Sequence, residues 1–244
     1  MGTAIVVTSG KGGTGKTSIT GGVAGSLARL GHSVLCIDMD IGLRNLDISL
    51  GLSDRALMDF SDVAEGRCPL VRAAVNHPDL PGLALLTAPM TLSSALTEEA
   101  VRRMLDTARS LYDYVLIDSP AGLGAGFRMA CCGADRAIVV STNDASSLRD
   151  AQRTVGELDF LRQIHLVMNR IQPKLLRELR TTIDDAMDAA GLPLIGVIPE
   201  DRRVILAANM GRPLILEGRR GAANACLNIA KRIEGYRVPI MRIR

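Results

Sequence analysis

The chain has 244 residues, a length that suits one large α/β domain or two small ones. Hydrophobic residues make up 47% of the chain but aromatic residues only 2%, so the core must be aliphatic. This scarcity argues against the aromatic stacking platforms of a single-stranded nucleic-acid binder. The net charge of +3 at pH 7 is nearly neutral and does not by itself indicate DNA or anionic lipid as a partner.

Short apolar runs alternate with longer helical patterns along the chain. The apolar runs predict strands over residues 4–8, 34–38, 83–86, 114–118, 137–141, 164–169 and 194–198. The helical patterns predict helices over residues 17–30, 97–111, 145–161, 173–190 and 221–234. Residues 52–82 form the loosest segment, with weak helical signals only. Strands that are apolar throughout are buried on both faces, and their alternation with helices predicts an α/β fold. We expect a mostly parallel twisted sheet flanked by helices on both faces, in a single domain over residues 1–244.

Cysteine usage and the start of the chain bear on the cellular compartment. The five cysteines form no C-x-x-C pair, and the histidines form no cluster at metal-binding spacing. Reduced thiols of the cytosol fit this odd number, and Cys36, Cys131 and Cys132 are expected to serve packing. The sequence enters an apolar strand at once without a basic leader, and no apolar run approaches the length of a membrane span. The expected location is the cytoplasm.

A glycine-rich segment after the first strand fits the pattern G-x-x-x-x-G-K-[ST]. The residues expected to bind the phosphates are Gly10, Lys11, Gly12, Gly13, Thr14, Gly15, Lys16, Thr17 and Ser18. Backbone N–H groups of such a loop turn toward one anion, and the following helix points its positive end at it. Lys16 would reach the β- and γ-phosphates, and the Thr17 hydroxyl would ligate Mg²⁺. A merely structural glycine turn is the alternative, but the position between a strand and a helix favours a P-loop NTPase.

Acidic residues end two of the predicted strands. Asp38 and Asp40 follow the second strand, and Asp118 ends the strand over residues 114–118 as a Walker B acid would. The carboxyl ends of parallel strands share one edge of the sheet with the phosphate-binding loop, so we expect these acids to meet there. A lone acid at a strand end is often only a cap, whereas three acids beside such a loop favour a magnesium and water site.

These motifs together resemble the MinD/ParA family of P-loop ATPases. Residues 10–17 (GKGGTGKT) look like the family's deviant Walker A motif, whose second, signature lysine corresponds to Lys11. Residues 38–47 (DMDIGLRNLD) resemble the switch I of its septum-site-determining members, and residues 118–122 (DSPAG) resemble switch II. Residues 146–150 (SSLRD) and 198–201 (IPED) also match, and the similarity runs from residue 4 to about residue 240.

The resemblance implies a catalytic role for four residues. Lys11 would reach across an ATP-bound homodimer to the partner's phosphates, together with Lys16 in its own site. Asp40 would position the attacking water, and Asn45 would help to order that water or the dimer contact. Asp38 and Asp118 would support Mg²⁺ through water, so the implied cofactors are ATP and Mg²⁺.

Two further positions have a functional and a plain structural interpretation. The resemblance implies that Asn169 recognises the adenine edge while residues 199–201 line the base. An amide suits adenine because it donates and accepts together, but Asn169 could equally be a turn residue at a strand end. Asp150 lies where the family docks the division inhibitor MinC, and a solvated helix acid is an equally good interpretation.

The resemblance implies a switch for placing the division site: an ATP-bound homodimer with a MinC-like inhibitor and a MinE-like activator as partners. The alternative is a partition-type ATPase that positions cargo through nonspecific DNA binding. Its basic face would use Arg202, Arg203, Arg212, Arg219 and Arg220, although a solvated surface is the default interpretation. A scaffold that binds ATP without hydrolysis is disfavoured because Asp40 and Asn45 are both present.

The C-terminal tail departs from the family pattern. Septum-site-determining members end in an amphipathic helix that binds anionic lipid, whereas residues 236–244 here are basic and apolar but interrupted by Pro239. The five residues after Pro239 are too few for a stable helix. We therefore expect weakened peripheral contact with the inner face of the cell membrane, and we expect the helix over residues 221–234 to pack on the domain.

Overall fold

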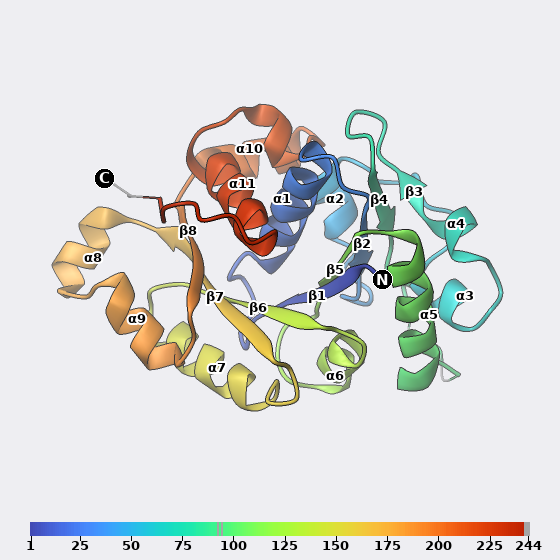
Figure 1. The fold of residues 1–244 in the computed structure, drawn as a ribbon, viewed down its shortest axis with the longest axis horizontal. Helices are drawn as coiled ribbons and strands as arrows, with labels where there is room; N and C mark the ends of the chain where they lie inside the picture. The colour runs from blue at the N-terminus through green and yellow to red at the C-terminus, as the bar shows by residue number, and fades with distance from the viewer. Residues whose placement is uncertain (92, 94, 242–244) are drawn as a thin grey trace.

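The centre of the molecule is a sheet of eight strands in the order β3-β4-β2-β5-β1-β6-β7-β8 (Figure 1). This computed structural model describes residues 1–91, 93 and 95–241. The strands are β1 (Thr3–Thr8), β2 (Val34–Asp38), β3 (Val75–Asn76), β4 (Leu83–Leu86), β5 (Tyr114–Asp118), β6 (Arg136–Ser141), β7 (Gln163–Ile171) and β8 (Leu194–Pro199). All pair in parallel except β3, which runs antiparallel to β4 at the edge. The predicted mostly parallel sheet is confirmed.

Helices cover both faces of the sheet. They are α1 (Lys16–Arg29), α2 (Leu46–Leu50), α3 (Phe60–Ala64), α4 (Leu70–Ala73), α5 (Glu98–Leu111), α6 (Ala125–Cys131), α7 (Ala145–Gly156), α8 (Pro173–Leu179), α9 (Ile183–Ala190), α10 (Arg202–Asn209) and α11 (Gly221–Ile233), with a 3-10 turn at Leu214–Glu217. One layer contains α1, α2, α10 and α11, and the other contains α3, α5, α6, α7 and α9 (Figure 1). No helix within the described residues is long and apolar enough to span a bilayer.

Two hydrophobic cores lie on opposite faces of the sheet. Along β1, Ile5 and Val7 join the core beneath α1 and α11, while Ala4 and Val6 join the core on the other face. All four side chains are buried, since successive residues of a strand point to opposite faces. This explains why the strand segments are apolar throughout.

The helix near the C-terminus packs on the domain as predicted. Ala222, Cys226, Ile229 and Ile233 of α11 are all buried in the core that α11 shares with α1. Close packing requires Gly22 on α1, because a Cβ there would lie 2.7 Å from the Cys226 sulfur. The described tail residues, 236–241, contain no helix.

The cysteines expected to serve packing lie in the core or against it. Cys36 and Cys131 are buried, and Cys132 is half-buried against the core on the α5 side of the sheet. Burial raises the pKa of all three thiols, which disfavours the reactive thiolate. These observations agree with a packing role.

The predicted helix over residues 173–190 is wrong, because the segment forms two helices. Arg180 adopts a left-handed conformation with φ of 53°, which ends α8. Thr182 then starts α9 through a capping box in which its side chain and that of Asp185 exchange hydrogen bonds with backbone N–H groups. The predicted helix over residues 145–161 is also too long, since α7 ends at Gly156.

Several short elements escape the sequence patterns. Helices α2, α3, α4, α6 and α10 have eight residues or fewer, which is too short to display helical periodicity. Three of the missed elements, α3, α4 and β3, lie in the segment over residues 52–82 that we expected to be loose. This segment is held in place by tertiary contacts.

One such contact is a buried histidine in the loop before β4. The backbone N–H groups of Asp79 and Leu80 donate to His77 Nδ1 at 3.0 and 3.1 Å. His77 Nε2 must therefore carry the proton, and it donates to the Leu50 carbonyl at 3.0 Å. Burial lowers the pKa of His77, so the neutral ring links this loop to the end of α2.

Candidate nucleotide and magnesium site

The phosphate-binding loop connects β1, which lies between β5 and β6, to the start of α1. Gly13 and Gly15 have φ values of 79° and 93°, a left-handed conformation that favours glycine. Gly15 is the N-cap of α1, and no side chain caps the helix there. The first N–H groups of α1 are therefore available to an anion.

Two glycines of the loop are required by their neighbours. A Cβ on Gly10 would lie 2.4 Å from the carbonyl oxygen of Asp150, so α7 approaches the loop backbone directly. A Cβ on Gly15 would lie 2.4 Å from the Asn169 amide nitrogen. By contrast, the nearest atom to a Cβ on Gly12 is the Ala121 Cβ at 3.8 Å, so the structure leaves space there.

Lys16 and Asp118 form the buried centre of the site. Lys16 is only 7% exposed, and burial lowers its pKa against the attraction of Asp118 and Asp40. Asp118 is 1% exposed, and burial raises its pKa to about 7. Burial thus disfavours the charged forms of both groups. An anion and a divalent cation bound at this point would stabilise those charged forms.

Asp118 is fixed by two hydroxyl groups of α1. Thr17 Oγ1 donates to Asp118 Oδ2 at 2.7 Å, and Thr20 Oγ1 donates to Asp118 Oδ1 at 3.0 Å. Thr17 is expected to ligate Mg²⁺ and Asp118 to support it through water, and the structure brings these two side chains into direct contact. Thr20 lies outside the loop motif, but its position one turn after Lys16 places it on the same face of α1.

Asp38 organises the loop that follows β2. Its two carboxylate oxygens accept hydrogen bonds from the backbone N–H groups of Asp40 at 2.9 Å and Leu46 at 3.1 Å. Burial raises the pKa of Asp38 to about 6, against these two hydrogen bonds. Asp38 and Asp118 are register neighbours in the paired strands β2 and β5, as predicted.

The same loop presents Asp40 and Asn45. Burial raises the pKa of Asp40, while the charge of Lys16 lowers it, so the two side chains interact electrostatically across the site. Asn45 is exposed and precedes α2 without capping it through its side chain. Its amide is therefore accessible for an external contact.

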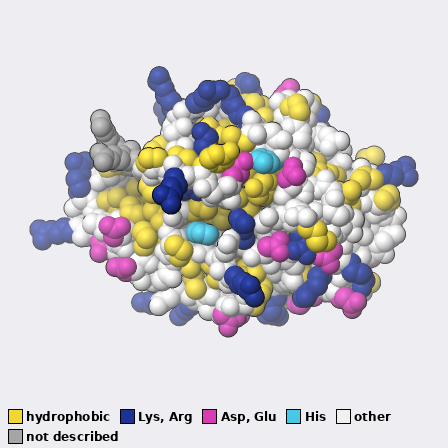
Figure 2. Space-filling model, in the orientation of Figure 1, with side chains coloured by type: hydrophobic (Ala, Val, Ile, Leu, Met, Phe, Trp, Pro, Cys, Tyr) yellow, Lys and Arg dark blue, Asp and Glu magenta, His cyan; other side chains and the backbone are white. Residues whose placement is uncertain are grey.

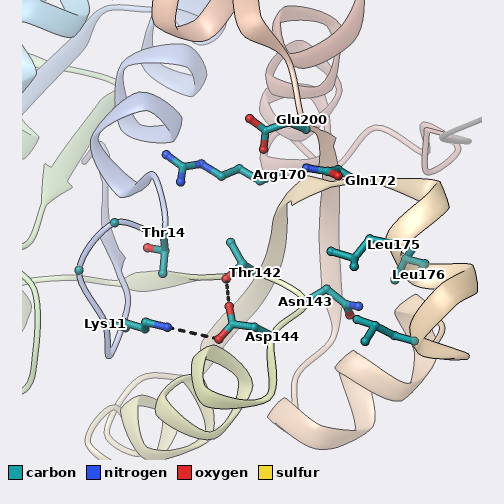
Figure 3. Close-up of a pocket in the computed structure, with 13 residues that line it drawn as sticks. Lys11, Thr14, Thr142, Asn143, Asp144, Arg170, Gln172, Leu175, Leu176 and Glu200 are labelled. Atoms are coloured by element: carbon teal, nitrogen blue, oxygen red, sulfur yellow. Dashed lines mark hydrogen bonds and ion pairs between the residues drawn. The ribbon is translucent and has the colours of Figure 1, made fainter.

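Lys11 points away from the centre of the site in the isolated chain. Its ammonium contacts Asp144 Oδ1 at 3.3 Å (Figure 3). It also donates to Ser146 Oγ at 2.8 Å, and both partners lie at the start of α7. The Lys11 and Asp144 side chains are 45% and 49% exposed. Partial burial raises the pKa of Asp144, but hydrogen bonds from Ser146 and Thr142 hold it well below its usual range. No local sequence pattern predicts this contact.

Asn169 lies between the phosphate-binding loop and a small cavity. Its amide nitrogen donates to the Thr14 carbonyl oxygen at 2.7 Å, and the side chain is 7% exposed. The cavity has a volume of about 160 Å³ and is lined by Asn169, residues 199–201 and the start of α10. The residues expected to line the base are thus together, but the donor group of Asn169 already holds the loop.

A larger cavity of about 380 Å³ lies on the other side of the loop, between Lys11 and α8 (Figure 3). Arg170 extends from β7 toward the loop and lines both cavities. Its φ of 54° is unusual for a residue with a side chain, and strained residues often occur at functional sites. No local sequence motif marks Arg170.

The residues present fit a magnesium nucleotide. The Thr14 hydroxyl is buried without a hydrogen-bond partner among the described residues, and the N-terminus of α1 is uncapped. The Thr17 hydroxyl lies beside a buried carboxylate, as a magnesium ligand requires. Within the described part of the chain, no group of three or more His, Cys, Asp or Glu residues could hold a metal alone. Oxygen atoms of the nucleotide would complete the coordination.

The remaining candidates are less well grouped. Asp150 lies on α7 with its backbone against Gly10, and its carboxylate contacts Arg153 at 3.7 Å. Of the basic residues proposed for DNA, Arg203 is paired with Asp201 at 2.8 Å and Arg212 with Glu217 at 3.3 Å. Pairing with acids reduces the positive potential that this face would offer to phosphates.

Comparison with known proteins establishes the family. The model of the CobQ/CobB/MinD/ParA nucleotide binding domain matches residues 5–214. The septum site-determining protein MinD of Synechocystis sp. is 40% identical over 242 residues, covering 97% of this chain and 91% of that protein. MinD of Bacillus subtilis is 41% identical, covering 98% and 92%. The chain belongs to the CobQ/CobB/MinD/ParA family and is a P-loop ATPase with ATP and Mg²⁺ as its cofactors.

Solved structures narrow the identification within the family. A chain of the MinC:MinD cell division protein complex of Aquifex aeolicus superposes with a TM-score of 0.91 at 37% identity, covering 98% of each chain. MinD from Pyrococcus horikoshii, complexed with Mg-ADP, gives a TM-score of 0.84 at 27% identity, covering 96% of each. A ParA family ATPase from Chlorobium tepidum is 21% identical and shares the fold. This chain is thus a MinD-like ATPase of division-site placement, and the partition-type alternative is less favoured.

Proposed function

We propose that this ATPase is a dimerisation switch. The ATP-bound form is a homodimer that recruits a MinC-like division inhibitor, and hydrolysis stimulated by a MinE-like activator returns it to the monomer. The observation that most directly supports this proposal is the position of Lys11. The side chain of this loop lysine is not buried in its own nucleotide site. An ammonium held at the mouth of the site by two exposed contacts is free to exchange them for an anion presented by a second copy.

Each catalytic residue has a role that its environment supports. Lys16, buried beside Asp118, would hold the phosphates of its own chain, and Lys11 would contact those of the partner. Asp40, half-buried and opposite Lys16, would orient the attacking water. Asn45, exposed at the start of α2, would order that water or contact the second copy. When bound, Mg²⁺ would neutralise phosphate charge, with the Thr17 hydroxyl, Asp118 and Asp38 in position to hold it.

The MinC-like partner follows from the Aquifex aeolicus complex and from the surface of α7. This helix carries Asp150, whose backbone packs on Gly10. Asp144 and Ser146, at the start of the helix, contact the Lys11 ammonium. A change in the loop would therefore reach α7 directly. This contact supports Asp150 as part of a partner surface that responds to the nucleotide.

We place the protein in the cytoplasm, in peripheral contact with the inner face of the cell membrane. Residues 236–241 lie against the body of the domain: Arg232 donates to the carbonyls of Val238 at 3.0 Å and Pro239 at 2.6 Å, and Met241 packs against the core. This arrangement supports a membrane contact weaker than a free amphipathic helix would provide.

The switch is tested by size-exclusion chromatography with saturating ATP and Mg²⁺. Asp40→Ala, which retains both lysines but lacks the water-positioning group, is expected to elute as a dimer. Lys11→Ala in that background is expected to elute as a monomer that still binds ATP. Lys174→Ala, which removes an exposed lysine on α8, is the matched control and should remain dimeric. If Asp40→Ala stays monomeric with ATP bound, the switch is wrong.

A further inference from the structure

A groove of about 650 Å³ lies at the edge of the sheet opposite the nucleotide site. It is formed by the starts of β6, β7 and β8 together with the C-terminal end of α11. Figure 2 shows it as a hollow with a hydrophobic floor in the middle of the visible face, with basic side chains around its margin. Its volume is within the range of small-molecule sites in proteins.

The floor of the groove is apolar because residues of both hydrophobic cores reach it. Ile164 and Leu194 are half-buried and pack against one hydrophobic core, while Ile195 belongs to the other. Ile138 of β6 also lines the groove, and the Tyr236 side chain contributes to its wall. An aliphatic or ring-shaped body placed on this floor would cover apolar surface that the chain leaves open.

Three arginines line the same groove without acidic partners. Arg136 donates to the Ile233 carbonyl at 3.3 Å, Arg232 donates to backbone carbonyls including that of Ile195 at 2.8 Å, and Arg162 is exposed. Within the described residues, no carboxylate lies within ion-pairing distance of any of the three.

One acid lines the groove beside the three arginines, so their charge is only partly offset. Glu234 is the acid that lines it, and its carboxylate is paired with His32. Burial and the neighbouring Arg136 lower the pKa of His165, and burial lowers the pKa of Arg232. The His165 shift thus reflects burial and the positive charge of Arg136, whereas the Arg232 shift reflects burial alone.

We propose that this groove is a binding site for a small amphipathic anion, with a carboxylate or phosphate head between the arginines and an apolar body on the floor. Guanidinium groups bind both head groups through paired hydrogen bonds, and a neutral head would leave that pairing unused. The volume of about 650 Å³ favours a small molecule over a macromolecular partner. The site is separate from the phosphate-binding loop, so it adds a ligand to the proposed ATPase switch.

The proposal is tested with the full chain and the anionic fluorophore 8-anilinonaphthalene-1-sulfonate. The fluorophore is expected to bind with enhanced fluorescence, and decanoate or decyl phosphate is expected to displace it. The more effective of these two identifies the preferred head group. Decyl glucoside, with the same chain and a neutral head, should compete at least about tenfold less well. Mg-ATP should not displace the fluorophore, because it binds at the opposite edge.

Substitutions locate the site. Arg162→Gln is the primary variant because this exposed side chain contributes no described contact to the fold, and it should weaken decanoate binding about tenfold. Arg136→Gln should have a similar effect. Arg72→Gln, which removes an exposed arginine on α4, should leave binding unchanged, and all three variants should retain ATP binding. Absent fluorophore binding, equal competition by decyl glucoside, or unchanged binding in both groove variants would overturn the proposal.

Discussion

The contact between Lys11 and the start of α7 predicts how the dimerisation equilibrium is set. The Lys11 ammonium donates to Ser146 Oγ at 2.8 Å, and this bond must break if Lys11 is to reach a second copy. Because the Lys11 side chain is 45% exposed, the bond contributes only about 0.5 kcal/mol after screening by solvent. A dimer breaks two such bonds, one in each copy, at a total of about 1 kcal/mol. Ser146→Ala is therefore expected to tighten the ATP-dependent dimer about fivefold.

This effect is measurable by sedimentation of the Asp40→Ala protein with saturating Mg-ATP over a range of protein concentrations. Ser146→Ala added to that background should lower the dimer dissociation constant. Ser110→Ala is the matched control, because its hydroxyl bonds to the Thr107 carbonyl on the distant helix α5. An unchanged or weaker dimer in the Ser146→Ala protein would refute the idea that α7 restrains Lys11 in the monomer.

Three other perturbations test the site and the fold. Gly10→Ala should lower the free energy of unfolding by about 1–3 kcal/mol in urea, because the added Cβ would collide with the α7 backbone. Gly12→Ala is the matched control, because the structure leaves space for its Cβ, and it should leave the free energy of unfolding unchanged without nucleotide. Asn169→Ala should weaken nucleotide binding by removing the bond to the Thr14 carbonyl. Equal losses for ATP and GTP in a binding titration would contradict adenine recognition by this residue. His77, whose pKa is lowered in the folded state, stabilises the chain above about pH 6.5 and loses that contribution as the pH falls. Relative to His77→Asn, the wild-type chain should therefore lose stability between about pH 7 and pH 5, and a constant difference would contradict this role.

The central part of the site was predictable from local patterns. The glycine-rich loop, Lys16 and the acids Asp38 and Asp118 are all identified by their spacing and by their position at strand ends. Parallel strands bring their carboxyl ends to one edge, and Asp38 and Asp118 are indeed register neighbours there. The apolar strands predicted the sheet for a similar reason, since burial on both faces leaves a continuous apolar run.

Other parts of the site depend on contacts between segments that are far apart in the chain. Thr14 and Asn169 are 155 residues apart, and Lys11 and Ser146 are 135 residues apart. No periodicity links such positions, so neither hydrogen bond could be predicted. Arg170 belongs to no local sequence motif, and its left-handed backbone conformation is evident only in the structure.

The sequence by itself determined the phosphate-binding loop, its acids and the layered α/β fold, because each depends on local spacing or on burial of continuous segments. Only the tertiary structure decided that Lys11 contacts α7, that Asn169 holds the loop, and that three arginines line one apolar groove. These features arise where separate strands and helices end beside one another, and the order of strands in the sheet determines which ends meet.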